Sequence, residues 1–264
     1  MRILRTEEWA DPTPHAAREV RKALPEAPTE HAPVLFVPGF GGGAWVYAEN
    51  WLAHAASRGV PAYAMSPRGH GESGAAPKAD LRAYTHDVVQ VAASLPRQAV
   101  LVGHGAGALV VAQALARYPA RAAVLLAPVF GGWGPAFGAW ARNPFGVTPA
   151  IFGGALRPRR GQLFSPETPV EEQREYASRR GRASARAQWQ LARHRGPEQP
   201  VGEPPVLVVG SPDDKLVPAK ELDRVARRYR GSPLLFPGMG HDLMLDASWR
   251  EPIDAILDWL EKNP

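Results

Sequence analysis

The stretch that most constrains the fold of this chain runs from residue 99 to residue 118, where an apolar run, a glycine-rich turn and a helical segment follow one another. The four residues Ala99–Val102 predict a short strand that is buried on both faces. Gly103–Gly107 is a tight turn, and the composition of Ala106–Tyr118 predicts a helix that Pro119 ends. We therefore expect a strand, a sharp turn and a helix in direct succession.

Strand-like and helix-like segments alternate on both sides of this stretch. Further strands are expected over Arg2–Thr6 (at an edge), Val34–Val37, Val60–Met65, Arg121–Ala127, Val206–Val209 and Pro233–Phe236. Further helices are expected over Ala16–Leu24, Ala44–Ser57, Leu81–Leu95, Ala219–Tyr229 and Ala247–Glu261. Such alternation predicts an α/β fold, a mostly parallel central sheet flanked by helices on both faces.

Residues 129–205 interrupt the alternation. Phe130–Phe152 is rich in glycine, proline and aromatic residues, and Glu171–Arg195 predicts one or two helices rich in arginine and alanine. We therefore expect a core formed by residues 1–128 and 206–264, and a mainly helical cap or lid inserted at residues 129–205.

Composition excludes several classes of chemistry and location. The 264 residues include no cysteine, so disulfides, thiolate catalysis and thiolate metal sites are ruled out. Two long runs without charge, Gln98–Ala116 and Ala122–Ala141, have the length of membrane spans, but glycine or proline breaks each one, and we expect no integral membrane segment. The start of the sequence has no apolar signal region, which makes the cytoplasm the expected location.

The net charge of +5 comes from an arginine-rich chain. No basic stretch alternates with aromatic residues as in a nucleic-acid platform, so we expect no nucleic-acid partner. The arginines of residues 157–195 fit either solvated helix faces or contacts with an anionic head group. The sequence leaves that choice open, and it leaves the oligomeric state open as well.

Four further motifs occur in a fixed order around the turn at residues 103–107. They are the glycine loop Pro38–Gly43, the segment Arg68–Ser73 (RGHGES), the acidic segment Gly210–Pro218 and the histidine loop Gly238–Met244. Together they resemble the α/β-hydrolase superfamily, in particular the monoacylglycerol lipase and lysophospholipase-like esterases. The resemblance extends over almost the whole chain beyond residue 32, and the interrupted segment stands where that family has its cap.

The resemblance implies roles for individual residues. The backbone amides of Phe40 and Ala106 would form the oxyanion hole, which stabilises the alkoxide that develops during acyl transfer. His241 would be the catalytic base, and an aspartate would orient its imidazole. The segment Arg68–Ser73 would be scaffold, with His70 fixing the loop by hydrogen bonds. No metal and no cofactor are implied.

The position of the catalytic aspartate is ambiguous, because Gly210–Pro218 is one residue longer than the G-x-x-D-x-x-V-P segment of the family. Counting forward from Gly210 selects Asp213, whereas counting back from Val217 selects Asp214. We predict Asp214 as the acid and interpret Asp213 as a turn or capping residue.

Gly105 is where this chain departs from the family. The middle residue of the G-x-S-x-G turn is the serine nucleophile, and here it is glycine. A serine at this position is held in a strained backbone conformation that glycine adopts without steric cost. The preceding His104 is interpreted as a support of the turn. The substitution therefore relieves strain and removes covalent chemistry, whether it is natural or a deliberate replacement.

Three functions are compatible with these residues. The chain can be an inactivated ester hydrolase, a non-covalent enzyme in which His241 and Asp214 activate water or a substrate proton, as in a lyase or isomerase, or a ligand-binding pseudoenzyme. A small acyl ester or similar apolar molecule is the expected substrate or ligand. Its pocket is expected among the aromatic residues of the cap and the histidine loop, namely Trp133, Phe137, Trp140, Phe145 and Met239, with Phe152 as a further cap aromatic. The cap aromatics can equally form the packing core of the cap itself.

Overall fold

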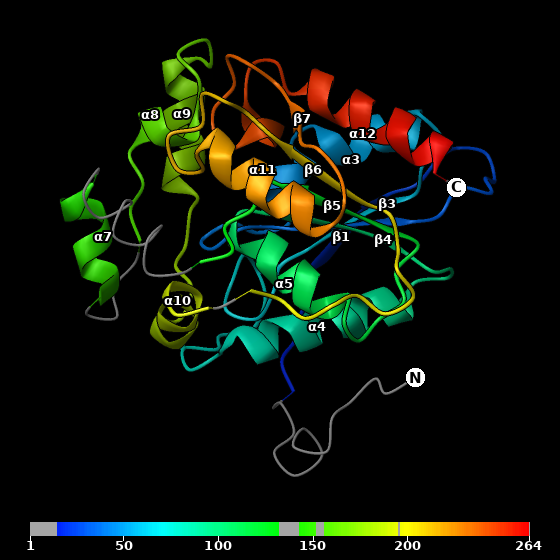
Figure 1. The fold of residues 1–264 in the computed structure, drawn as a ribbon, viewed down its shortest axis with the longest axis horizontal. Helices are drawn as coiled ribbons and strands as arrows, with labels where there is room; N and C mark the ends of the chain where they lie inside the picture. The colour runs from blue at the N-terminus through cyan, green and yellow to red at the C-terminus, as the bar shows by residue number, and fades with distance from the viewer. Residues whose placement is uncertain (1–14, 132–142, 152–155, 195, 264) are drawn as a thin grey trace.

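In the computed structural model, residues 15–131, 143–151, 156–194 and 196–263 are described, and they contain one mostly parallel sheet (Figure 1). The strands are β1 (Val20–Ala23), β2 (Val34–Val37), β3 (Ala62–Met65), β4 (Val100–His104), β5 (Ala122–Leu126), β6 (Val206–Gly210) and β7 (Leu234–Leu235). Their order across the sheet is β1-β3-β2-β4-β5-β6-β7. Only the β1–β3 pair is antiparallel. The predicted fold class is confirmed.

Helices cover both faces of this sheet. In the core they are α2 (Trp45–Ala48), α3 (Trp51–Ser57), α4 (Leu81–Ser94), α5 (Ala106–Ala114), α11 (Ala219–Arg228) and α12 (Arg250–Lys262), with the 3-10 turn η1 (Leu243–Leu245). Figure 1 shows α3 and α12 together on one side of the sheet and α4 and α5 on the other. Because both faces are covered, every residue of β2, β4 and β5 is buried, as expected of central parallel strands.

Four helices lie in the described residues between β5 and β6, the segment in which we expected a cap. They are α7 (Pro144–Ile151), α8 (Arg160–Leu163), α9 (Val170–Ser178) and α10 (Ala185–Ala192). Figure 1 shows them gathered at one end of the molecule, beside the core. The second half of the segment thus contains two helices, α9 and α10. We call residues 129–205 the cap segment; its division from the core as a separate domain stays a prediction.

Two local predictions were wrong. Residues 20–23 of the expected helix Ala16–Leu24 form the strand β1, because Val20 and Ala23 pair with Met65 and Ala62 at the sheet edge. The expected helix Ala44–Ser57 is broken into α2 and α3 at Asn50, whose φ of −134° is not helical. The expected strand Arg2–Thr6 lies outside the described residues.

None of the helices in the described ranges is both long and apolar enough to cross a bilayer.

Candidate active site

Gly105 forms the turn between β4 and α5, in a conformation that an L-residue rarely adopts. Its φ is +54° and its ψ is −121°. The Gly105 amide donates to Leu126 O at 2.9 Å, and its carbonyl accepts from the amides of Ala108 and Val129. A Cβ placed on Gly105 would lie 3.3 Å from His241 Nε2 and 3.9 Å from Gly39 Cα. A side chain at this position would therefore point at the imidazole of His241.

His241 and Asp214 form a buried pair that brings together two loops at the carboxyl ends of β6 and β7. His241 Nδ1 lies 2.7 Å from Asp214 Oδ2. The other oxygen of Asp214, Oδ1, accepts the amides of Leu216 and Val217 at 2.7 and 3.0 Å, which fixes the carboxylate. Asp213 instead accepts the amide of Gly238 at 2.7 Å. The structure thus places Asp214, not Asp213, against the imidazole.

The groups around His241 raise its pKa and so make it a stronger base. Burial lowers the pKa of His241, but the charge of Asp214 and its hydrogen bond raise it, and the balance leaves the pKa above its ordinary value. With Nδ1 bound to the carboxylate, Nε2 faces the position above Gly105. None of the hydrogen bonds between described residues uses this Nε2. The pair can therefore accept a proton from a group placed above Gly105.

The amides of Phe40 and Ala106 lie on the two segments that meet at Gly105. Ala106 is the first residue of α5, and Phe40 directly follows Gly39, whose Cα faces the space above Gly105. Neither amide takes part in a hydrogen bond between described residues, as expected of donors kept for a ligand. The two segments touch closely, since a Cβ on Gly107 would lie only 2.3 Å from Pro38 O.

His70 lies in the scaffold rather than in the reactive group. It is buried, and Nδ1 lies 3.2 Å from Arg68 O. Its ring contacts the rings of Tyr84 and Phe40, with centroids 5.2 and 6.2 Å apart. Burial lowers the pKa of His70, so the ring stays neutral near pH 7. His70 therefore supports the loop that lies beside Phe40.

The expected pocket residues are only partly described. Met239 is buried in the core, next to Gly240 and His241. The side chain of Phe145 is 87% exposed on α7, so it does not have the enclosed position expected of a pocket wall. Trp133, Phe137, Trp140 and Phe152 lie outside the described residues. The cap arginines Arg186 and Arg193 line a surface cavity of about 790 Å³ between α4, α5 and α10, away from Gly105.

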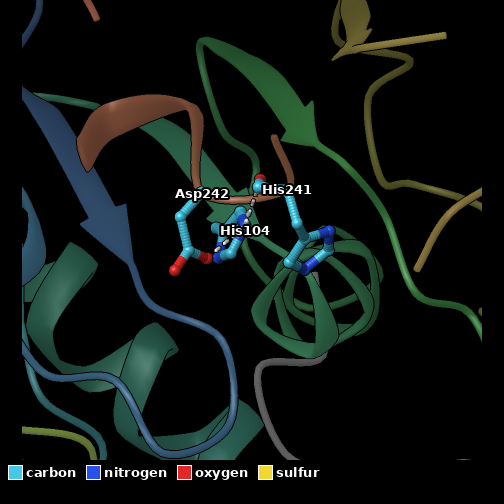
Figure 2. A group of neighbouring side chains, drawn as sticks. All are labelled: His104, His241 and Asp242. Carbon is cyan, nitrogen blue, oxygen red and sulfur yellow. Dashed lines mark hydrogen bonds and ion pairs between the residues drawn. The ribbon is translucent and has the colours of Figure 1, made fainter. Parts of the chain in front are cut away.

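A second group of buried polar side chains, which the sequence did not indicate as part of the site, lies beside His241 (Figure 2). His104 Nε2 lies 3.1 Å from His241 O and 3.6 Å from Asp242 Oδ1. Arg180, from the cap segment, pairs with Asp242 Oδ2. The only sequence signal for Asp242 is that it follows His241, and none marked Arg180 among the many cap arginines.

Ligand atoms of His104, His241 and Asp242 lie within 4.8 Å of one another, as the side chains around a metal ion do. The contacts of these residues do not fit a cation. Arg180 already places a positive charge on Asp242, and Asp214 holds His241 Nδ1. We therefore assign the cluster no metal.

Comparisons with known proteins agree with the fold. The model of the alpha/beta hydrolase family matches residues 34–258. No curated protein sequence matches the chain significantly. Among solved structures, a thermophilic esterase from Thermogutta terrifontis superposes with a TM-score of 0.70 at 20% identity, covering 93% of each chain.

Two lipase structures superpose similarly. The monoacylglycerol lipase of Paleococcus ferrophilus gives a TM-score of 0.68 at 18% identity, covering 95% of this chain and 100% of that one. A soluble variant of monoglyceride lipase from Saccharomyces cerevisiae, in complex with a substrate analog, gives 0.73 at 11% identity, covering 93% and 92%. At these identities the likeness establishes the fold alone.

Proposed function

The chain belongs to the alpha/beta hydrolase family, and from this we propose that its site is that of a carboxylic-ester hydrolase from which the nucleophilic hydroxyl is missing. One observation supports the proposal most directly: a Cβ on Gly105 would point at His241 Nε2 from 3.3 Å. A serine there would present its hydroxyl to the histidine. The solved esterases and lipases that share the fold support a small acyl ester as substrate.

The residues described above would supply the remaining groups that acyl transfer needs. With a serine at position 105, His241 Nε2 would take the hydroxyl proton as the oxygen attacks the ester carbonyl. Asp214 would stabilise the imidazolium through Nδ1, and the amides of Phe40 and Ala106 would donate to the oxyanion. His241 would then return the proton to the leaving alcohol. Gly105 supplies no hydroxyl, so we expect covalent hydrolysis to be absent from this chain.

The substitution Gly105→Ser tests this proposal. We expect Gly105→Ser to hydrolyse p-nitrophenyl acetate and to be labelled by a fluorophosphonate, and Gly105→Ser/His241→Ala to do neither. Gly105→Ala is the matched control, since it adds the same Cβ at a φ of +54° without a hydroxyl. Both single variants should lose about 1–3 kcal/mol of unfolding free energy to backbone strain. A folded Gly105→Ser that stays inert on esters, thioesters and amides would contradict the proposal.

A second function is favoured by the position above Gly105, which no side chain of that residue fills. His241 Nε2 faces this position, and in the unaltered chain it can take a proton from a water molecule that attacks an ester held by the two amides. The unaltered chain should then turn over an ester without fluorophosphonate labelling, and His241→Ala should abolish that turnover. Binding of an ester, seen as a thermal shift without product, would instead indicate a pseudoenzyme.

A further inference from the structure

Three consecutive residues between α9 and α10 each contact a different part of the core. Arg179 pairs with Glu49 at 2.6 Å and lies 4.2 Å above the ring of Trp45. Arg180 pairs with Asp242, in the loop of His241. The amide of Gly181 donates to Gly41 O at 2.8 Å, in the loop of Phe40. We call residues 179–181 the clasp, because this one segment joins the two loops that flank Gly105.

The backbone of the clasp lies so close to the loop of Phe40 that no side chain would fit on Gly41. Gly41 has a φ of +80°, and a Cβ on it would lie 2.7 Å from Gly181 O. Two backbones can approach this closely only where one residue lacks a side chain. The position of the Phe40 loop is therefore coupled to that of the cap segment.

The clasp also carries the charge that balances Asp242. Asp242 is fully buried, and within the described ranges its Oδ1 has no hydrogen-bond partner. His104 is 3.6 Å from this oxygen, but burial lowers the pKa of His104 to about 4, so the ring is neutral near pH 7. A paired positive charge stabilises a buried carboxylate. Arg180 supplies that charge from the cap segment.

The loop that carries His241 is tied to the cap segment at two more points. The amide of Asp242 donates to Leu163 O at 2.9 Å. Asp246 accepts the amide of Gly240 and both the amide and the hydroxyl of Ser165 at 2.8 to 2.9 Å. Several polar groups of the loop that carries His241 therefore bind to the cap segment.

We propose that Arg180 is a positioning residue for His241: by balancing the buried charge of Asp242, it holds the loop that aims His241 at position 105. The Gly181–Gly41 contact holds the Phe40 amide in the same arrangement. The effect on catalysis rests on the proposed function. The effect on His241 itself does not, and it can be measured in the chain as it exists.

The charges around His241 predict that removing Arg180 and removing the carboxylate of Asp242 shift the pKa of His241 in opposite directions. The groups that face it are Asp214 from the loop after β6, His104 from β4, Asp242 from its own loop and Arg180 from the clasp. Without Arg180, the charge of Asp242 is unopposed and should raise the pKa of His241. Without the carboxylate of Asp242, the guanidinium of Arg180 is unopposed and should lower that pKa.

NMR titration of the histidine rings tests the proposal, with His241 assigned through His241→Gln. We expect the pKa of His241 to rise by about 1 unit in Arg180→Gln and to fall by a similar amount in Asp242→Asn. The double variant should return close to the unaltered value. Arg174→Gln is the matched control, because this cap arginine is 60% exposed and pairs only with Glu171 among described residues; it should change nothing.

Two results would overturn the proposal. One is an unchanged pKa in Arg180→Gln, and the other is a shift of the same sign in Arg180→Gln and Asp242→Asn, which a mere loosening of the loop would give. If Arg180→Gln does not fold, Asp242→Asn carries the test alone, and a pKa that does not fall overturns the proposal.

The catalytic consequence is measured on the Gly105→Ser background. Adding Arg180→Gln should lower kcat for p-nitrophenyl acetate about tenfold or more while KM changes little, because a misaimed base slows the chemical step. Adding Arg174→Gln should leave both constants unchanged. An inert Gly105→Ser would contradict the proposed function but leave the titration valid, so the two failures are distinguishable.

Discussion

His104 precedes Gly105 in the chain, and its buried ring supports the loop of His241 through the carbonyl of that residue. Burial, above all, lowers its pKa from 6.5 to about 4. The folded state therefore resists protonation of His104, whereas the unfolded chain accepts the proton below about pH 6.5. Below that pH the unfolded state binds more protons, so the stabilisation is complete above pH 6.5 and is lost as the pH falls toward 4.

We predict that His104→Gln reduces this pH dependence. A fall of the pKa from 6.5 to about 4 is equivalent to about 3 kcal/mol at full effect, so the contribution of His104 to the unfolding free energy should rise by about that amount between pH 4 and pH 6.5. Urea denaturation at intervals of pH measures the slope for both proteins. The raised pKa of His241 acts in the opposite direction and is common to both, so it cancels in the comparison. If the unfolding free energies of the two proteins have equal slopes against pH, the lowered pKa of His104 is contradicted.

At the scale of elements, the site depends on how closely α5 packs against the loop after β2. The first turn of α5 lies against backbone carbonyls, since a Cβ on Gly107 would be 2.3 Å from Pro38 O and 2.8 Å from Val37 O. Backbone carbonyls at the end of a buried strand cannot move aside as a flexible side chain can. This contact sets the distance between the amides of Ala106 and Phe40.

We predict that Gly107→Ala destabilises the protein by about 1–3 kcal/mol through overpacking and separates the two amides. Thermal or urea unfolding gives the first effect, and a loss of p-nitrophenyl acetate hydrolysis on the Gly105→Ser background gives the second. Gly231→Ala is the control, because its Cβ would meet nothing closer than Ala226 O at 3.9 Å. A Gly107→Ala protein as stable as this control would show that α5 can shift away from the loop.

Across the whole molecule, two charge clusters join segments that are far apart in the sequence, and they differ in burial. Asp87 on α4 is fully buried and accepts bonds from Arg68 and Arg18 at 2.7 to 3.0 Å. Arg58 at the end of α3 is partly exposed and pairs with Asp254, Asp258 and Glu261 on or beside α12. Water screens the second cluster and not the first.

We predict very different costs for removing one member of each cluster. Asp87→Ala should lower the unfolding free energy by about 3–5 kcal/mol, because it breaks the buried ion pair between Asp87 and Arg68. Arg58→Ala should cost about 1 kcal/mol or less and should lose its effect at high salt. Urea denaturation at low and high sodium chloride compares the two. If both variants lose a similar amount of unfolding free energy, burial does not determine how much these ion pairs contribute to stability.

The extent to which the sequence predicted this protein differs between its core and its site. Central strands such as β2 and β5 read as unbroken apolar runs because they are buried on both faces, so their pattern was visible without a structure. The edge strand β1 was mistaken for a helix, because only its pairing with β3 makes it a strand. The break at Asn50 was missed because neither glycine nor proline marks it.

The sequence by itself determined the alternating α/β architecture and the glycine at the turn, together with a short set of polar residues that could serve it. Local composition carries that information, because strands, turns and helices each have their own residue preferences. The tertiary structure decided which residues meet: Asp214 rather than Asp213 against His241, and Arg180 against Asp242. These contacts join residues 27 and 62 positions apart. They depend on how loops from different strands converge, which no local pattern encodes.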